Sequence, residues 1–412
     1  MSKQPYDVIV IGAGIVGLAT ARDLLLRYPG LRLVVAEKDA QVGAEQTGHN
    51  SGVMHAGIYY KAGSLKATLC TTGVQMLFAY CAERGIPVDR CGKVIVATDT
   101  AELPRLDDLY ARGLANGVPG LERIGPERLR ELEPHAAGIA AIYSPHTAIV
   151  DFRRVAQAYA ADIRQAGGVI VTRCAVTRIR QSPAGIRIST VRGGLTTKSL
   201  ISCAGLQSDR LARLAGAPHD VQIIPFRGDY YVLRPEKRYL CRGLIYPVPD
   251  PALPFLGVHF TRRIDGDVWA GPNAVLAFAR QGYRRVDINL NDLAELAMYP
   301  GFWRMAQTYW QTGLEEMYRD FVKPAFVRAL QRYVPECRSE DVVAGPAGVR
   351  AQAVGADGTL VDDFLVYAAD NMVHVRNAPS PAATSSLAIA RLIADRAVLE
   401  CRVLAERVPA RA

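Results

Sequence analysis

The sequence has no run of about 20 consecutive apolar residues, the length that a membrane-spanning helix needs. Residues 1–11 carry one early lysine and run into a glycine-rich turn, which fits a strand better than a signal peptide. Half of the 412 residues are hydrophobic and 22% are charged, a composition typical of a globular protein large enough for two or three domains. We therefore expect a cytoplasmic protein.

Closely spaced cysteines and blocks of basic residues are also missing. The eight cysteines include no Cys-x-x-Cys pair, which argues against a zinc site, a redox pair or a disulfide scaffold. Lysine and arginine outnumber aspartate and glutamate by 49 to 40, but no five of them are consecutive. A solvated basic surface is therefore the simpler interpretation of the net charge, and we expect neither a bound metal nor a nucleic-acid partner.

What the sequence does contain is a dinucleotide-binding motif near its N-terminus. The apolar run Tyr6–Ile11 leads directly into Gly12, Gly14 and Gly17 of a Gly-x-Gly-x-x-Gly motif, and a helix-like segment follows. In this motif the first glycine allows the turn, the second lets a pyrophosphate approach the backbone, and the third lets the helix pack closely on the strand. The N-terminus of that helix favours phosphate binding.

An acidic residue follows at the position where such a fold uses one. The apolar run 33–36 ends at Glu37, whose carboxylate can accept hydrogen bonds from ribose hydroxyls. The motif occurs only once in the chain. Because enzymes that take electrons from NAD(P)H usually carry a second dinucleotide fold, a flavin bound here would be reduced by an organic substrate.

Two further segments have the residues to line a cofactor. Residues 46–60 combine glycines with two histidines and two tyrosines, whereas a plain surface loop would explain only the glycines and serine. Near the C-terminus, Ser380 fits an N-cap and Pro381 the first position of a last helix. The positive end of that helix would stabilise negative charge on a reduced flavin, although a plain helix cap is the alternative.

Candidate substrate contacts come from single residues in strand-like segments. Arg227 and Arg350 stand beside glycines and could each bind a carboxylate, but a surface salt bridge is an equal alternative. His259 lies in an apolar run, where a hydrogen-bonded core histidine is commoner than a base. The aromatic helical segment around Trp303 and Trp310 is interpreted first as core packing, with contact to a membrane surface as the alternative.

The whole chain from residue 6 to about residue 400 resembles the L-2-hydroxyglutarate oxidases and dehydrogenases, a branch of the FAD-dependent D-amino-acid-oxidase-like superfamily. The resemblance depends on stretches far more specific than the glycine motif. They are Thr47–Val53, Gly57–Tyr60, Pro225–Gly228, Pro254–His259, Gly271–Phe278, Pro346–Gln352 and Asn377–Thr384.

The resemblance implies a mixed α/β fold with two domains. We assign residues 1–90, 148–220 and 336–405 to a discontinuous Rossmann-like FAD-binding domain. Residues 91–147 and 221–335 would form an inserted substrate-binding domain with an antiparallel sheet.

The resemblance also implies FAD as the cofactor and a set of residues around it. The three glycines would hold the pyrophosphate, and Glu37 would bind the adenosine ribose with Lys38 beside it. The other implied cofactor contacts are Thr47, Asn50, Ser51, Gly52, Val176, Ala204, Gly205, Ser380, Pro381, Ala382, Ala383 and Thr384.

The implied reaction is oxidation of L-2-hydroxyglutarate, a dicarboxylate, to 2-oxoglutarate by hydride transfer to flavin N5, with electrons passed to membrane quinone or oxygen. Arg227 and Arg350 would bind the two carboxylates, and His55 or His259 would accept the hydroxyl proton. Hydrogen bonds to the substrate would come from Tyr59, Tyr60 and Tyr230.

Several alternatives stay open at this point. The substrate could be another 2-hydroxy acid, an amino acid or glycerol phosphate. A protein of a different class, a basic flavoprotein that binds nucleic acid, is a further alternative. The protein could also visit the cytoplasmic membrane, and His49 and His55 leave covalent attachment of the flavin undecided.

Overall fold

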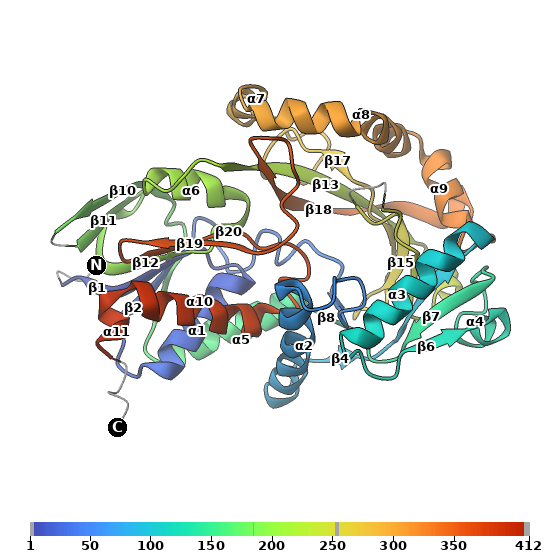
Figure 1. The fold of residues 1–412 in the computed structure, drawn as a ribbon, viewed down its shortest axis with the longest axis horizontal. Coiled ribbons are helices and arrows are strands. Elements are labelled where there is room, and N and C mark those ends of the chain that lie inside the picture. Colours follow the sequence, from blue (N-terminus) through green and yellow to red (C-terminus); the bar gives the residue numbers. More distant parts are fainter. Residues whose placement is uncertain (1–3, 184, 252–254, 408–412) are drawn as a thin grey trace.

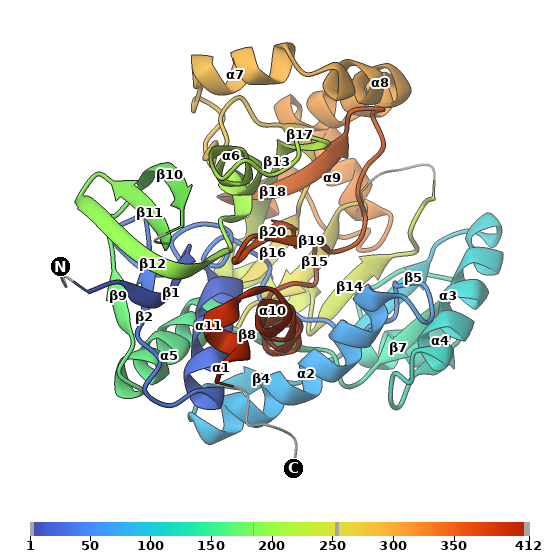
Figure 2. The ribbon, with the colours of Figure 1, turned by 60° about the vertical axis from the view of Figure 1, so that its left-hand side comes forward.

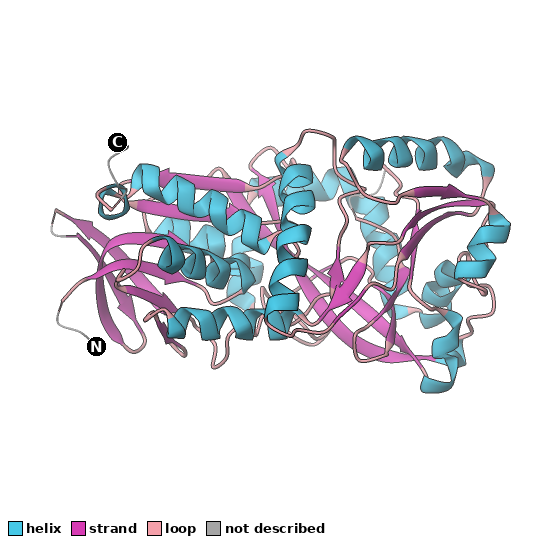
Figure 3. Ribbon diagram, turned by 90° about the horizontal axis from the view of Figure 1, so that it is seen from below, coloured by secondary structure: helices cyan, strands magenta, loops and turns pink. Residues whose placement is uncertain are grey.

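Two large β-sheets occupy the two halves of the molecule, which lie side by side (Figures 1 and 3). The computed structural model describes residues 4–183, 185–251 and 255–407. Within these residues the first sheet has eight strands, the second has nine, and a small third sheet has three. Pro254 of the Pro254–His259 stretch lies outside the described residues.

The first sheet is parallel in its centre, as the glycine motif predicts. Strand β1 lies between β2 and β12, all three parallel, and the C-terminal part of β12 also pairs with β20 in parallel. The strands are β1 (Tyr6–Ile11), β2 (Leu33–Ala36), β9 (Val169–Val171), β10 (Val176–Ser182), β11 (Gly185–Thr190), β12 (Gly193–Ser202), β19 (Leu365–Ala369) and β20 (Met372–Asn377).

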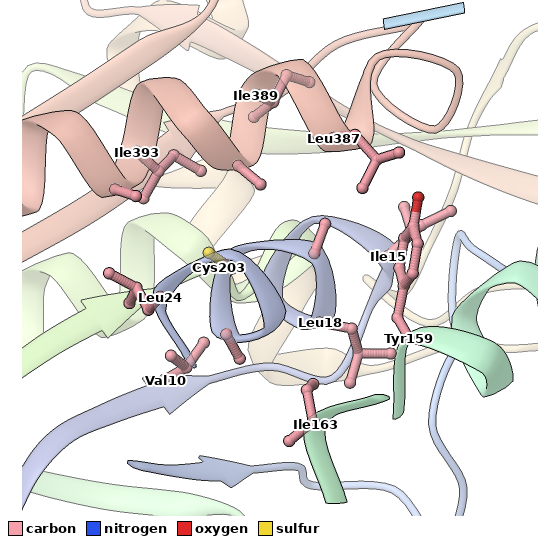
Figure 4. Close-up of a cluster of buried hydrophobic side chains, with 14 of the residues drawn as sticks. Val10, Ile15, Leu18, Leu24, Tyr159, Ile163, Cys203, Leu387, Ile389 and Ile393 are labelled. Atoms are coloured by element: carbon pink, nitrogen blue, oxygen red, sulfur yellow. The ribbon is translucent and has the colours of Figure 1, made fainter. Parts of the chain in front are cut away.

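Helices cover one face of this sheet. Both faces are buried, and successive side chains along a strand point to opposite faces. Val8 and Val10 pack with the helices, while Ile9 and Ile11 belong to a separate cluster on the other face. Helix α1 lies between β1 and α10, and Leu387 and Ile393 of α10 lie on the side that faces α1 (Figure 4). The helices of this half are α1 (Ile15–Arg27), α2 (Leu65–Glu83), α5 (Phe152–Gln165), α6 (Ser208–Leu214), α10 (Ser386–Glu400) and α11 (Arg402–Ala405).

The second sheet is mainly antiparallel, with β14 and β5 as a parallel pair. Its strands are β5 (Lys93–Ala97), β6 (Glu122–Ile124), β7 (Ala140–Ser144), β13 (Val221–Leu233), β14 (Leu244–Pro247), β15 (His259–Arg262), β16 (Val268–Gly271), β17 (Val275–Leu276) and β18 (Val342–Gly355). The helices of this half are α3 (Leu103–Ala115), α4 (Pro126–Leu132), α7 (Leu290–Ala297), α8 (Pro300–Phe321) and α9 (Lys323–Gln331).

Short elements complete the chain. The small sheet consists of β3 (Val53–Met54), β4 (Val88–Asp89) and β8 (Ala148–Val150), with β8 in the middle. The 3₁₀ turns are η1 (Thr100–Glu102), η2 (Gly205–Gln207), η3 (Pro235–Leu240) and η4 (Ser339–Asp341). In the described ranges no helix has both the length and the apolar character needed to cross a membrane.

Two sequence expectations need correction. Strand β18 pairs along its length with β13 in the second sheet, so the last domain border lies after β18 and not at residue 336. Helix α10 begins at Ser386 and not at Pro381, because the chain from Ser380 to Ser385 forms hydrogen-bonded turns. Figure 2 shows α10 beside α1 and α2, downstream of these turns.

Candidate active site

The three glycines of the motif have different neighbours, and only one of them leaves open space. Gly12 has a φ of +99°, and a Cβ there would collide with the carbonyl oxygen of Cys203. A Cβ on Gly17 would collide with the carbonyl oxygen of Gly12. A Cβ on Gly14 would meet only Thr47 Oγ1, at 3.6 Å, and its backbone is extended. The protein itself therefore does not require glycine at position 14, and this opening fits the pyrophosphate of FAD.

Glu37 lies at the end of β2 with its buried carboxylate next to the glycine turn. Its Oε2 accepts a hydrogen bond from Ala13 N at 2.6 Å, and its Oε1 accepts one from Asp39 N at 2.9 Å. Burial raises the pKa of this carboxyl group. Lys38 is ion-paired with Asp39 and Glu45, so it does not neutralise Glu37. The remaining lone pairs of Glu37 fit the predicted ribose contact.

The segment that we call the cofactor loop, residues 46–60, is shaped by its own polar side chains. Asn50 Nδ2 donates to the carbonyl oxygens of Gln46 and Thr47, at 3.1 and 2.7 Å, and Asn50 Oδ1 accepts from Gly52 N. Thr47 Oγ1 accepts from Ile15 N at 2.9 Å, at the start of α1. The side chains of Thr47 and Asn50 therefore hold the loop against the glycine turn.

The remaining predicted cofactor contacts lie on segments that border the same region. A Cβ on Gly205 would lie 2.9 Å from Gln46 Oε1, which places this residue against the cofactor loop. Ala204 and Val176 both pack on the buried cluster that contains Ile11. The predicted contacts thus come from the carboxyl-terminal side of the first sheet, where ligands bind in open α/β sheets.

The C-terminal turns meet the cofactor loop directly. Thr384 Oγ1 accepts a hydrogen bond from His55 N at 3.2 Å and donates one to Val53 O at 3.3 Å. The Ser380 side chain lies close enough to Tyr60 to lower the pKa of its phenol, although burial dominates and raises that pKa. The two segments that the sequence analysis selected, more than 300 residues apart, therefore lie together.

The two predicted arginines lie on opposite faces of the second sheet. In the β13–β18 pairing, Phe226 is opposite Arg350 and Arg227 is opposite Val349, so alternation separates the two guanidinium groups. Arg227 is buried and ion-paired with Asp229, at 2.8 Å, and with Asp320 of α8, at 3.2 Å. Its charge is compensated within the protein, so the structure does not bring Arg227 together with Arg350.

Arg350 lies on the face that looks toward the cofactor loop. A Cβ on Gly348, two residues earlier on the same face, would lie 2.6 Å from His49 O of that loop. The Arg350 guanidinium lies 4.9 Å from the ring centroid of Phe255 and has no ion pair or hydrogen bond with any described residue. Burial lowers its pKa, and the electrostatic influence of Tyr230 opposes this shift. Tyr230 is thus a neighbour of Arg350.

The two candidate histidines differ in the state of their rings. His259 Nδ1 lies 2.9 Å from Gly257 O, and because a carbonyl only accepts, Nδ1 carries the proton and Nε2 carries a lone pair. Its ring packs on Tyr246 with centroids 3.9 Å apart. Burial lowers the pKa of both His55 and His259 to about 3, so both are neutral near pH 7. Within the described residues, His55 Nδ1 has no hydrogen-bond partner.

Sequence reasoning missed two cations next to these groups. Lys93 Nζ lies 4.6 Å from the ring centroid of Tyr59 and 5.2 Å from that of Tyr246. Arg263 donates from Nη1 to Asn50 O at 2.8 Å and lies over Trp269. A lysine at the start of an otherwise apolar strand, Lys93–Ala97, was the available signal for Lys93, whereas Arg263 had none.

Comparisons with known proteins identify the family to which the chain belongs. The FAD dependent oxidoreductase (DAO) family matches residues 7–396. The mitochondrial L-2-hydroxyglutarate dehydrogenases of Nematostella vectensis and Homo sapiens are 50% and 48% identical to this chain, covering 96% of it and 91% and 89% of their own lengths. A bacterial L-2-hydroxyglutarate dehydrogenase from Indibacter alkaliphilus is 47% identical over 95% of this chain and 99% of its own.

Solved structures share the fold at lower identity. The L-alpha-glycerophosphate oxidase of Mycoplasma pneumoniae, solved with FAD bound, superposes with a TM-score of 0.78 at 24% identity and covers 98% of this chain and 95% of its own. A glycine oxidase from Geobacillus kaustophilus gives 0.71 at 18% identity, covering 97% and 96%. The chain therefore belongs to the FAD-dependent oxidoreductase (DAO) family, within which it groups with the L-2-hydroxyglutarate dehydrogenases.

Proposed function

We propose that this protein oxidises L-2-hydroxyglutarate to 2-oxoglutarate. The relatives that are about half identical to this chain are named for this substrate. The observation that carries the proposal for this chain is a pair of groups beside the cofactor loop: an uncompensated guanidinium, Arg350, lies close to a neutral histidine, His259. FAD, when bound, supplies the acceptor for the hydride that leaves the substrate carbon.

The chain's own residues would position the substrate and remove a proton. The planar guanidinium of Arg350 gives two parallel hydrogen bonds to the carboxylate next to the reacting carbon, which fixes the orientation of the C–H bond. His259 Nε2 accepts the hydroxyl proton, because Gly257 O already holds the Nδ1 proton and fixes the ring. A bound anionic substrate also raises the low pKa of His259, which brings it closer to the pKa that a base needs.

The direct test is reduction of the flavin by substrate without oxygen. We expect the purified protein to be yellow and to lose its visible flavin absorbance on addition of L-2-hydroxyglutarate. The D enantiomer, glycine, L-proline and glycerol 3-phosphate should leave the spectrum unchanged on the same timescale. Faster bleaching by an amino acid or by glycerol 3-phosphate would contradict the proposal.

The same assay separates the two histidines. If His259 is the base, His259→Gln slows bleaching by about 10²- to 10⁴-fold, the usual contribution of a general base. His55→Gln should slow it much less, because the His55 backbone, not its ring, contacts Thr384. The opposite ranking would assign the proton to His55.

We also propose that electrons leave to a quinone at a membrane surface, which the exposed side of α7 and α8 supports. Trp303 and Trp310 are 59% and 57% exposed, so the expectation of core packing is wrong for these two residues, although Met305 of the same segment is buried with Phe302 and Tyr309 packed against its cluster. Leu290, Met298 and Phe321 of the same region are at least 70% exposed. Monomeric proteins rarely expose contiguous apolar surface of this kind, and indole rings favour the membrane interface.

Sedimentation with anionic lipid vesicles tests this membrane contact. The double substitution Trp303→Ser and Trp310→Ser should reduce the bound fraction several-fold and leave flavin bleaching intact. The matched control is Leu26→Ser with Leu399→Ser, which removes exposed apolar side chains from α1 and α10 in the other half of the molecule. If the tryptophan variant binds to the vesicles as well as the wild type does, the proposed membrane contact is wrong.

A further inference from the structure

Lys93 is a buried ammonium group that the protein leaves without a partner. Its side chain is 1% exposed, and within the described residues it has no hydrogen bond and no ion pair. Within the same residues, its cation–π contacts are with the rings of Tyr59 and Tyr246. Burial lowers the pKa of Lys93 to about 7, as expected for a cation that nothing compensates.

Apart from Arg350, the other buried cations of the described chain are all compensated. Lys66 pairs with Asp362, Arg227 with Asp320, Arg280 with Asp209, and Arg376 with Asp220. An unpaired buried charge is strongly unfavourable, so this fold pairs such charges where no ligand is expected. Lys93 and Arg350 are the exceptions, and both lie close to His259.

Tyr246 links Lys93 to the proposed base, because Lys93 Nζ lies 5.2 Å from the Tyr246 ring centroid and the ring of His259 lies 3.9 Å from the same centroid. Lys93 and Arg350 both lie close enough to His259 to lower its pKa electrostatically. Neither cation pairs with a carboxylate among the described residues. The hydroxyl of Tyr59, whose ring lies beside Lys93, is buried and has no hydrogen-bond partner in the same part of the chain. An unsatisfied donor next to an uncompensated cation is a site for an anion.

We infer that Lys93 and the Tyr59 hydroxyl form the subsite for the second carboxylate of the substrate, the one remote from the reacting carbon. The inference rests on the proposed function for the identity of the acid. The sequence predicts Arg227 and Arg350 as the two cations that bind the substrate carboxylates. Because Arg227 is on the other face of the sheet, Lys93 takes its place. One carboxylate would then bind to Arg350 and the other to Lys93, and both cations are close to His259. This arrangement selects dicarboxylates over acids with one negative end.

The test compares two ligands that differ only at that end. Glutarate and valerate have the same five-carbon chain, but valerate has a methyl group in place of the second carboxylate. Binding of each to the FAD-loaded protein is followed by the change in the visible flavin spectrum. We expect the wild type to bind glutarate at least about 100-fold more tightly than valerate, and Lys93→Met to lose this difference while its affinity for valerate is unchanged.

Two further variants separate recognition from structural damage. Lys66→Met removes another buried lysine, one that is paired with Asp362, and it should alter the two affinities by the same factor. Tyr59→Phe removes one oxygen that has no partner in the described chain, so it should fold normally and weaken glutarate binding about 10-fold without affecting valerate. Tyr59→Phe keeps the inference testable if Lys93→Met does not fold.

The outcomes distinguish this inference from the proposed function. Failure of L-2-hydroxyglutarate to bleach the flavin, together with a preference for glutarate that Lys93→Met abolishes, would reject the substrate and support the subsite. Equal wild-type affinity for glutarate and valerate would overturn the subsite. So would a Lys93→Met protein that loses affinity for both acids in equal measure.

Discussion

Replacing Arg350 with methionine is expected to raise the KM for L-2-hydroxyglutarate by about 100- to 1000-fold while the protein keeps its FAD. The reason is that Arg350 is the cation on the loop-facing side of β18, and a buried charge that loses its partner costs about 2–5 kcal/mol of binding. Arg350→Lys keeps the charge but not the planar fork, so it should recover only part of the loss. Steady-state kinetics with a dye acceptor, alongside the flavin-to-protein absorbance ratio, measures both quantities.

Arg227→Met provides the matched comparison on the opposite face of the same strand pair. It leaves Asp229 and Asp320 without their cation, so it should lower the free energy of unfolding by about 3–5 kcal/mol. The folded fraction should keep a KM close to that of the wild type. A large KM increase in Arg227→Met, or an unchanged KM in Arg350→Met, would reverse the assignment of the two residues.

The contrast between these arginines shows which part of the site the sequence could predict. Both residues stand beside glycines in motifs of the same family, and local sequence gives them equal weight. The difference comes from the register of β13 against β18, which pairs residues more than 100 positions apart, and from Asp320 on a separate helix. Alternation along a strand is readable from sequence, but the face that meets the cofactor is set by the partner strand.

The spacing of residues along the chain predicted the site better where the site residues are close together in the sequence. The glycine turn, Glu37 and the cofactor loop all lie within residues 6–60 on consecutive elements, so their order along the chain fixed their arrangement. The start of α10 was misplaced because Ser380 and Pro381 satisfy the local rules for a helix start. The chain instead uses them in hydrogen-bonded turns that precede the helix. Lys93 was missed because its partners, Tyr59 and Tyr246, come from distant segments.

Placing an aspartate at position 14 is expected to stabilise the apoprotein slightly and to abolish FAD binding. Gly14 is the N-cap of α1 with an extended backbone, a conformation and a position that aspartate favours. A carboxylate there interacts well with the positive end of the helix, so the free energy of unfolding without FAD should rise by about 0.5 kcal/mol. The same charge would occupy the opening for the pyrophosphate and repel it.

Because Gly14→Asp is expected to raise the stability of the apoprotein but to abolish FAD binding, it tests the cofactor site directly. Thermal unfolding of the apoprotein and titration with FAD measure the two effects separately, and we expect a stable, colourless protein with at least about 1000-fold weaker FAD binding. Gly17→Ala is the control, because a methyl group there collides with Gly12 O and should destabilise the apoprotein itself. A yellow Gly14→Asp protein would mean that the opening beside Thr47 is not where the pyrophosphate binds. The assignment of the glycine turn to FAD would then fail, because Gly14 is the one glycine of the motif whose neighbours leave room for a ligand.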